Sequence, residues 1–294
     1  MFTEKPILRK EATPARSLRI AGLAGIVGAL IAAIAGSVWV VGGQNSLPGF
    51  TPALKPAFVV AELFTSEGCS SCPPADDLLA KLVEQQPVPG VTVVGLSESV
   101  DYWNRLGWVD PFSSNSFTQR QMDYESKAFH GTNVFTPQLV IDGAAEEVGS
   151  DAGSVYRAIA RAAMVPKAAM KVSAEMEPAA GSLRVRLEIG DMASLADGKP
   201  IDVVVAVAEN DLTSDVPRGE NSGRRLRHAA VARKLQVIGE ISNRSRASAY
   251  TASLPMTREW KAENIKVIGF LQERESRRIV GAGWSQVSVG QALR

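Results

Sequence analysis

The two cysteines of this chain, Cys69 and Cys72, are separated by only two residues, and no other sequence feature constrains the fold as strongly. An apolar run at residues 57–64 precedes them and predicts a buried strand. Residues 69–86 carry apolar side chains at three- and four-residue spacing and predict a helix that starts near the cysteines. Free N–H groups and the helix dipole stabilise a thiolate at such a helix start. One thiol could then attack a partner while the other resolves the product.

Alternating strand and helix patterns continue along the chain and predict an α/β domain at residues 57–166. After the first strand and helix we expect a strand at 91–96, a helix at 116–129, a strand at 138–142 and a helix at 152–164. This order is that of a thioredoxin-like sheet.

Thr136 and Pro137 introduce the strand at 138–142. In thioredoxin-like folds the proline at this point follows a cis peptide bond and lies beside the disulfide. The backbone before it can pair with a substrate peptide. We therefore expect Pro137 to act with the cysteines and Thr136 to bind substrate.

The pattern changes after residue 168. Residues 183–189 alternate strictly between apolar and polar side chains, and several other short runs have strand character, without a long helical pattern. Residues 168–294 are therefore predicted to form an all-β, sandwich-like domain. The expected fold class is an α/β thioredoxin-like domain followed by this all-β sandwich-like domain, with an N-terminal transmembrane helix.

The transmembrane prediction comes from residues 20–41, which contain no charged side chain and are long enough to span a bilayer. Positive charges dominate residues 1–19, which predicts a cytoplasmic N-terminus. Residues 42–56 would be a linker. We expect an inner-membrane, single-pass protein whose folded part faces the periplasm. A cleaved signal peptide is the alternative, and it would release the protein into the periplasm.

Four further residues are candidates for the site. Glu62, on the strand that leads to the cysteines, is expected either to receive a proton during thiol exchange or to form an ordinary salt bridge. Tyr102, Trp103 and Trp108 lie in one polar and aromatic segment. They are expected either to form a wall of a substrate groove or to pack over the sheet edge. The charged loop at residues 218–228 is typical of a solvated hairpin, with an anion site as the alternative.

Composition excludes several functions. Lys and Arg number 32 against 31 Asp and Glu, and a net charge of +1 provides no field that would attract nucleic acid. A structural zinc site is not expected, because there is no second cysteine pair and His130 and His228 are the only histidines. We expect no cofactor. Two alternatives stay open for the cysteine pair: a structural disulfide in a binding or scaffold module, and a copper carrier that uses both thiolates.

Four separate stretches resemble an exported bacterial family, catalogued as domain of unknown function twelve-twenty-three. They are residues 62–76, residues 100–103 with 106–108, residues 136–138, and the loop at 218–224. The resemblance implies a thioredoxin-like domain followed by a β-rich domain, in a family without an established activity.

Together these observations predict a thiol-disulfide exchange protein. Cys69 would be the nucleophile, Cys72 the resolving thiol and Pro137 a contact to the substrate peptide. The partner would be a protein thiol or disulfide, and the β domain would select it.

Overall fold

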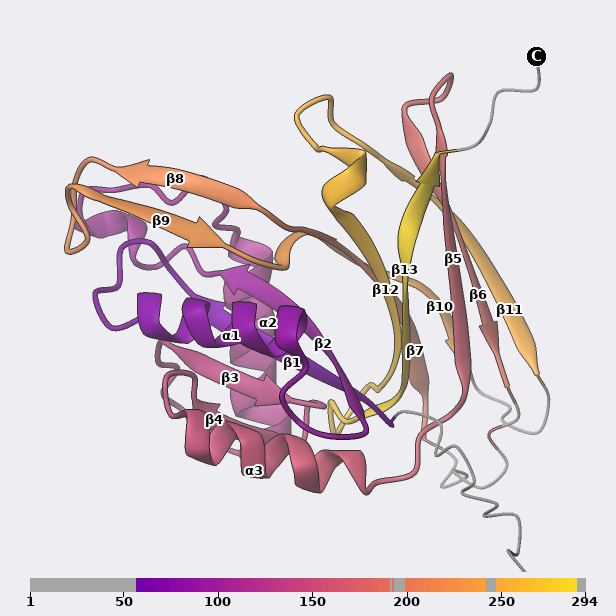
Figure 1. The fold of residues 1–294 in the computed structure, drawn as a ribbon. Helices are drawn as coiled ribbons and strands as arrows, with labels where there is room; N and C mark the ends of the chain where they lie inside the picture. The colour runs from indigo at the N-terminus through magenta and orange to yellow at the C-terminus, as the bar shows by residue number, and fades with distance from the viewer. Residues whose placement is uncertain (1–56, 191, 193–198, 242–246, 290–294) are drawn as a thin grey trace, which may run out of the picture. The chain divides into compact units, whose positions relative to one another are not determined.

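Eleven strands form one mixed sheet in the part of the chain that the structure describes, residues 57–190, 192, 199–241 and 247–289 of a computed structural model (Figure 1). In chain order the strands and helices are β1 Ala57–Thr65, α1 Pro73–Gln85, β2 Val91–Ser99, α2 Asn115–Tyr124, β3 Gln138–Ile141, β4 Ala145–Val148, α3 Ala152–Ala163, β5 Met170–Glu177, β6 Ser182–Ile189, β7 Ile201–Glu209, β8 Leu212–Val216, β9 Arg224–His228, β10 Val231–Ile241, β11 Ser248–Pro255, β12 Ile265–Glu273 and β13 Ile279–Val289. A π-helical turn, Glu125–Phe129, extends α2.

The order of strands in the large sheet is β11-β6-β5-β13-β12-β7-β10-β2-β1-β3-β4. Three neighbouring pairs are parallel: β1 with β2, β2 with β10, and β5 with β13. The other pairs are antiparallel. Strands β8 and β9 form a separate two-stranded hairpin.

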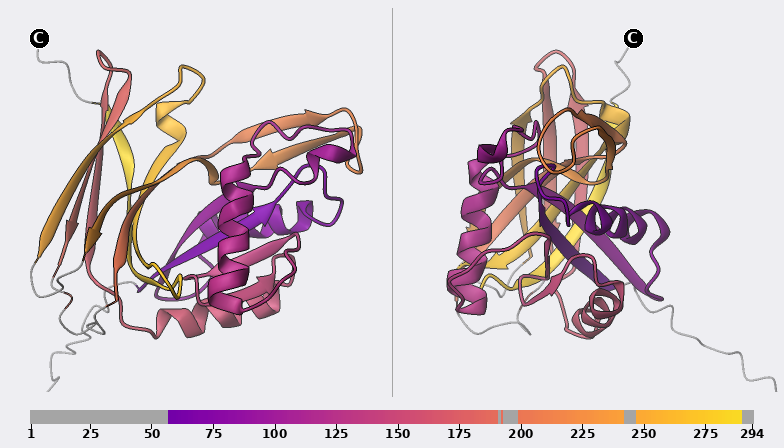
Figure 2. Two further views of the ribbon diagram at one scale, coloured as in Figure 1. Left: turned by 180° about the vertical axis from the view of Figure 1, so that it is seen from behind. Right: turned by 90° about the vertical axis from the view of Figure 1, so that its left-hand side faces the viewer.

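Strand β1 is an almost continuous apolar run because helices cover both of its faces. Val59, Ala61 and Leu63 pack against α1 and α3, whereas Val60 and Phe64 on the other face pack on the side of α2. Figure 2 shows α2 on one side of these strands and α1 and α3 on the other. The run therefore has the pattern of a central strand rather than of a half-exposed one.

Strand β7 connects the two halves of the chain through a shared core. One of its faces packs into the core of the C-terminal strands, with Val203 and Val205. Its other face, with Val204 and Ala206, packs in one cluster with Val60 of β1 and with residues of β2 and α2. The apolar side chains of both halves are thus removed from water together.

The expected fold class, an α/β thioredoxin-like domain followed by an all-β sandwich-like domain with a transmembrane helix, is wrong. Strands dominate the described residues, which contain three α-helices, and a single sheet runs through both halves. Strand β10 pairs with β2, where Ser97 donates its N–H to the Ala230 carbonyl at 2.8 Å. This pairing, at Val231 and Ser97, joins the C-terminal strands to the edge of β2 that an isolated N-terminal sheet would leave open.

The membrane prediction is also corrected. Across residues 57–289, in the ranges given above, no helix is long and apolar enough to cross a membrane. The expected anchor at 20–41 and the expected linker at 42–56 lie outside the described residues. The inner-membrane, single-pass assignment therefore finds no support in the structure.

A buried polar network crosses the sheet on the side of α2. The guanidinium of Arg120 donates to Glu62 at 2.6 Å and to Gln272 of β12 at 3.1 Å, and it lies 3.6 Å from Glu98. Tyr124 donates its hydroxyl to Glu62. Burial, together with the charge of Glu62, raises the pKa of Glu98 well above its ordinary value, although Arg120 acts in the opposite direction.

We expect Arg120→Met to destabilise the protein by about 3–5 kcal/mol, because it leaves Glu62 buried without its guanidinium partner. Glu98→Gln should change the free energy of unfolding by less than about 1.5 kcal/mol, because an amide copies the shape of the protonated carboxyl that burial favours. Urea unfolding at pH 7 measures both. Equal losses in the two variants would show that Glu98 is charged in the fold.

Candidate functional site

The cysteine pair lies in the turn between β1 and α1. Cys69 and Cys72 form a disulfide with their Cα atoms 5.5 Å apart. The helix begins at Pro73, directly after Cys72 at the N-cap position, which confirms the expected start near the cysteines. The amides of Ala75 and Asp76 donate to the Cys72 carbonyl at 2.8 and 3.1 Å. Cys69 thus lies beyond the helix start, where a thiolate would gain from the helix dipole.

Thr136 is brought directly to the first sulfur. Its hydroxyl lies 3.3 Å and its carbonyl oxygen 3.9 Å from Cys69 Sγ. The Thr136–Pro137 peptide bond is cis, which confirms the expectation for the isomer. Trp103 donates its indole N–H to the Thr136 hydroxyl at 2.9 Å and so holds this residue in place.

The other three predicted residues, Trp108, Tyr102 and Glu62, do not contact the sulfurs directly. Trp108 donates its indole N–H to the carboxylate of Glu67, two residues before Cys69, at 2.6 Å. Tyr102 donates to Gln121 at 3.3 Å and contacts the α2 side of the molecule. Glu62 is fully buried with Arg120 and Tyr124, and it projects from the face of β1 opposite to the one that α1 covers. Trp103 therefore contacts the site through Thr136, and Trp108 is connected to it through Glu67. Glu62 belongs to a different cluster, with Arg120.

Glu67 lies at the centre of the site, and the sequence analysis did not name it as a candidate residue. Its carboxylate accepts hydrogen bonds from Trp108 and Ser214 and lies 3.0 Å from His228 Nε2. Its amide donates to Asp110 at 3.0 Å. Ser214 and Glu67 both approach the same ring nitrogen of His228, so these three residues are not arranged as a serine–histidine–acid relay.

The Glu67–His228 pair is buried, and each group shifts the pKa of the other. Burial alone would raise the pKa of Glu67, but hydrogen bonds from His228, Ser214 and Trp108 lower it below its ordinary value. Burial alone would lower the pKa of His228, but the bond to Glu67 and the charges of Asp76, Glu67 and Asp110 raise it. The ion pair is therefore favoured between these two pKa values.

The charged loop at 218–228, expected to be a solvated hairpin, does belong to the β8–β9 hairpin and has mostly exposed side chains at its tip, but it also docks on the cysteine turn. Asn221 is buried and donates its amide to the carbonyls of Glu67 and Cys69 at 2.8 and 2.9 Å. Ser70 donates its backbone N–H to the Glu220 carboxylate at 2.9 Å. Figure 1 shows the β8–β9 hairpin running alongside β1, α1 and β2. Cys69 and Cys72 are 1% and 0% exposed.

Asp76 is a second acidic group that the sequence did not single out. It lies one helical turn after Cys72 in α1, and residues at this spacing have Cβ atoms about 5–6 Å apart. Burial raises the pKa of Asp76 to about 7, against the lowering effect of the His228 charge. Its Oδ1 atom is buried without a hydrogen-bond partner. No spacing rule links Asp76 or Glu67 to His228, because the hairpin brings that histidine from far along the chain.

The described ranges were also expected to lack a structural zinc site. They contain no group of three or more histidine, cysteine, aspartate and glutamate side chains that could hold a metal ion.

Comparison with known proteins identifies the family. The model described as Protein of unknown function (DUF1223) matches residues 60–272. The chain belongs to this family. A protein from Agrobacterium tumefaciens with a known crystal structure shares 30% sequence identity with this chain. The two structures match with a TM-score of 0.60 over 80% of this chain and 97% of that chain.

A more distant similarity concerns the fold of this DUF1223 protein alone. HBP35 of Porphyromonas gingivalis is 14% identical, with a TM-score of 0.58, and the match covers 81% of this chain and 80% of that one. Curated proteins provided no match.

The buried His228–Glu67 pair predicts a pH-dependent stability for this DUF1223 protein. Because the pKa of His228 is raised above its unfolded value of about 6.5, its contribution is complete below pH 6.5 and is lost as the pH rises through the folded pKa. At pH 6 we expect His228→Gln to melt about 2–4 °C below the wild type, equivalent to about 1 kcal/mol. By pH 9 this gap should narrow.

The exposed histidine provides the control. His130→Gln should leave the pH dependence of the melting temperature unchanged, since His130 lies at the surface. A gap between His228→Gln and wild type that is constant from pH 6 to 9 would contradict the ion-pair account.

Proposed function

We propose that this protein exchanges a disulfide with a thiol or disulfide of a partner protein through Cys69 and Cys72. The observation that carries the proposal is the position of Cys69, which lies beyond the start of α1 and 3.9 Å from the Thr136 carbonyl oxygen. The start of the helix favours a thiolate on Cys69. The Thr136 carbonyl oxygen is an acceptor for a hydrogen bond from the backbone of an extended partner peptide.

The exchange needs no added oxidant or reductant. In the reduced protein, the Cys69 thiolate attacks a partner disulfide, so that a mixed disulfide forms and one partner thiolate leaves. Cys72 then loses its proton and attacks the Cys69 sulfur, which closes the Cys69–Cys72 bond and releases the second partner thiolate. The partner gains two electrons and the cysteine pair loses two. With a dithiol partner the same steps run in reverse.

We assign the proton of Cys72 to Asp76 in place of Glu62. Asp76 is on the same helix, one turn after Cys72, and burial raises its pKa to about 7, a value suited to accepting and returning a proton near neutral pH. Glu62 is engaged with Arg120 and Tyr124 on the other face of β1. Trp103 and Thr136 would form the wall against which the partner backbone lies.

The burial of both sulfurs supports a second candidate, in which the disulfide only braces the turn of a binding module. In that case a Cys69→Ser, Cys72→Ser double variant would melt at a lower temperature than the wild type and would keep its biological role. Trapping experiments separate the two functions.

We expect Cys72→Ser to accumulate mixed disulfides with partner proteins, because the remaining Cys69 thiol can attack but nothing resolves the product. Acid-quenched extracts, separated on non-reducing gels, should show these adducts for Cys72→Ser. The matched control is Cys69→Ser, which keeps only Cys72, the N-cap residue of α1, and should trap none. If neither variant forms an adduct, the bracing role is the better account.

Asp76→Asn should have opposite effects on stability and exchange. It removes the burial cost of a carboxylate that grows as the pH rises from about 4 to about 7, so the melting temperature at pH 8 should rise by at least about 2 °C. At pH 4 the difference should vanish. Turnover of a peptide disulfide at pH 7 should slow by on the order of tenfold or more.

The neighbouring acid provides the comparison for Asp76. Asp77 is exposed on α1, so Asp77→Asn should change neither quantity. Unchanged turnover in Asp76→Asn would remove Asp76 from the mechanism.

A further inference from the structure

The hairpin tip, residues 217–223, covers the cysteine turn, and we call it the cap. We propose that the cap restrains Cys69, with Glu220 as the residue that sets the reactivity of its thiol. The inference rests on the proposed function, because the thiol that the cap restrains is the proposed nucleophile. The cap comes from a part of the chain far from the cysteines in sequence, and it is ordered by its own turn, in which Gly223 donates to the Val216 carbonyl at 2.8 Å.

The body of the hairpin and its cap are held in different ways. The body is fixed by buried side chains, with Val216, Leu226 and His228 between 1% and 7% exposed. The hydrogen bonds that hold the cap on the cysteine turn run from Asn221 to the carbonyls of Glu67 and Cys69 and from Ser70 to Glu220, and the backbone of Gly219 also lies close to Trp108. Polar contacts of this kind exchange with water at a small net cost, so the cap can release while the body stays docked.

Glu220 binds the backbone of the residue that directly follows Cys69. The Ser70 N–H, next to Cys69 and before the start of α1, already donates to the Glu220 carboxylate at 2.9 Å. A thiolate on Cys69 would place a second negative charge beside this one. Like charges at short distance disfavour ionisation, so Glu220 keeps Cys69 protonated to a higher pH than the helix start alone would.

Other charged groups surround the turn and define the background of this effect. The hairpin contributes Arg224, which donates to Asn221 at 2.8 Å, and His228; the turn contributes Glu67; α1 contributes Asp76 and Asp77; and the aromatic segment contributes Asp110. Only Glu220 among them bonds to the backbone between the two cysteines in the described structure. Its charge is also exposed, so salt should screen it more than the buried groups.

The test measures alkylation of Cys69 in the reduced full-length protein by iodoacetamide, from pH 5 to 9, with peptide mass spectrometry to separate the two thiols. Glu220→Gln keeps an oxygen that can accept from Ser70 and removes only the charge. We expect the alkylation midpoint of Cys69 to fall by about 0.5–1 pH unit, and the rate at pH 7 to rise about three- to tenfold. High salt should bring the wild type toward this variant.

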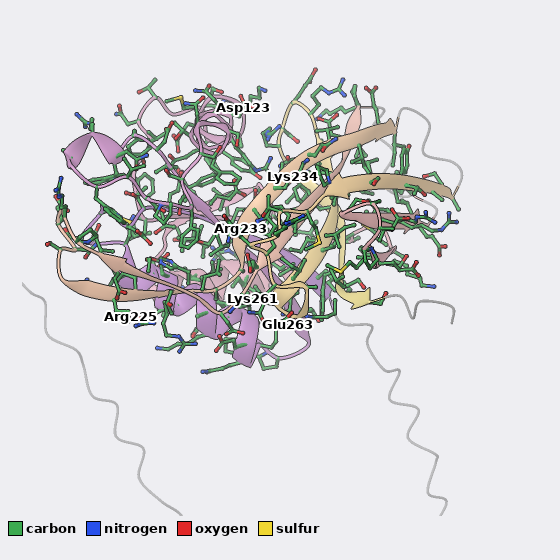
Figure 3. All side chains as sticks on the ribbon, turned by 90° about the horizontal axis from the view of Figure 1, so that it is seen from above. Asp123, Arg225, Arg233, Lys234, Lys261 and Glu263 are labelled. Carbon is green, nitrogen blue, oxygen red and sulfur yellow. A yellow bond between two sulfur atoms is a disulfide. The ribbon has the colours of Figure 1, made fainter. Side chains whose placement is uncertain are left out.

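Two more variants complete the design. Asn221→Ala removes the two hydrogen bonds from Asn221 to the cysteine turn. It should raise the alkylation rate of Cys69 at every pH, because the cap opens more often. Asp215→Asn removes an acid from the same hairpin, where Asp215 lies opposite Arg225 in the β8–β9 ladder, and it should match the wild type. Figure 3 labels Arg225 on this hairpin. A Glu220→Gln profile that superposes on the wild type, or an equal shift in Asp215→Asn, would overturn the proposal.

This readout separates the cap from the proposed function. Alkylation reports the Cys69 thiol without any partner protein. If Cys72→Ser traps no partner but Glu220→Gln shifts the alkylation profile, the restraint is real and the exchange function fails. If trapping succeeds and the Glu220→Gln profile does not move, the exchange function stands and the cap inference fails.

Discussion

The buried carboxylate of Glu67 joins three segments of this molecule that are distant in sequence. It accepts hydrogen bonds from Trp108 of the aromatic segment and Ser214 of β8, and it pairs with His228 of β9, while its own amide binds Asp110. A carboxylate taken out of water must find such partners or lose its charge. Because Glu67 is two residues before Cys69, satisfying it also fixes the hairpin against the cysteine turn. Access to the disulfide is therefore coupled to the docking of β8 and β9.

That coupling changes how the cysteine pair should be understood. The turn and helix start favour a reactive Cys69, whereas both cysteines are buried and the hairpin places a carboxylate on the backbone N–H of the next residue, Ser70. The two tendencies are compatible if reactivity depends on release of the cap. The same arrangement gives the C-terminal half of the chain a direct role at the site, since the hairpin is inserted between β7 and β10 of the shared sheet.

Local pattern predicted the local structure well. The run at 57–64 is β1, the strict alternation at 183–189 lies within β6, and the helices expected at 116–129 and 152–164 correspond to α2 with its π-turn and to α3. The pairing of Cys69 with Cys72 and the cis bond before Pro137 also followed from spacing and element order. The prediction of separate architectures for the two halves was wrong, because strand periodicity does not state which edge pairs with which, and β10 pairs with β2.

The amino-acid sequence by itself determined the strands, the helix that follows the cysteines and the disulfide, since each depends on residues close together along the chain. Tertiary structure alone decided which charges meet. Glu62 and Glu67 are both acids near the cysteine turn, yet one is paired with Arg120 of α2 and the other with His228 of the hairpin. Side chains alternate between the two faces of a strand, and the packing of distant elements sets what each face contacts. The partners of a buried charge are therefore fixed only when the sheet and its hairpin assemble.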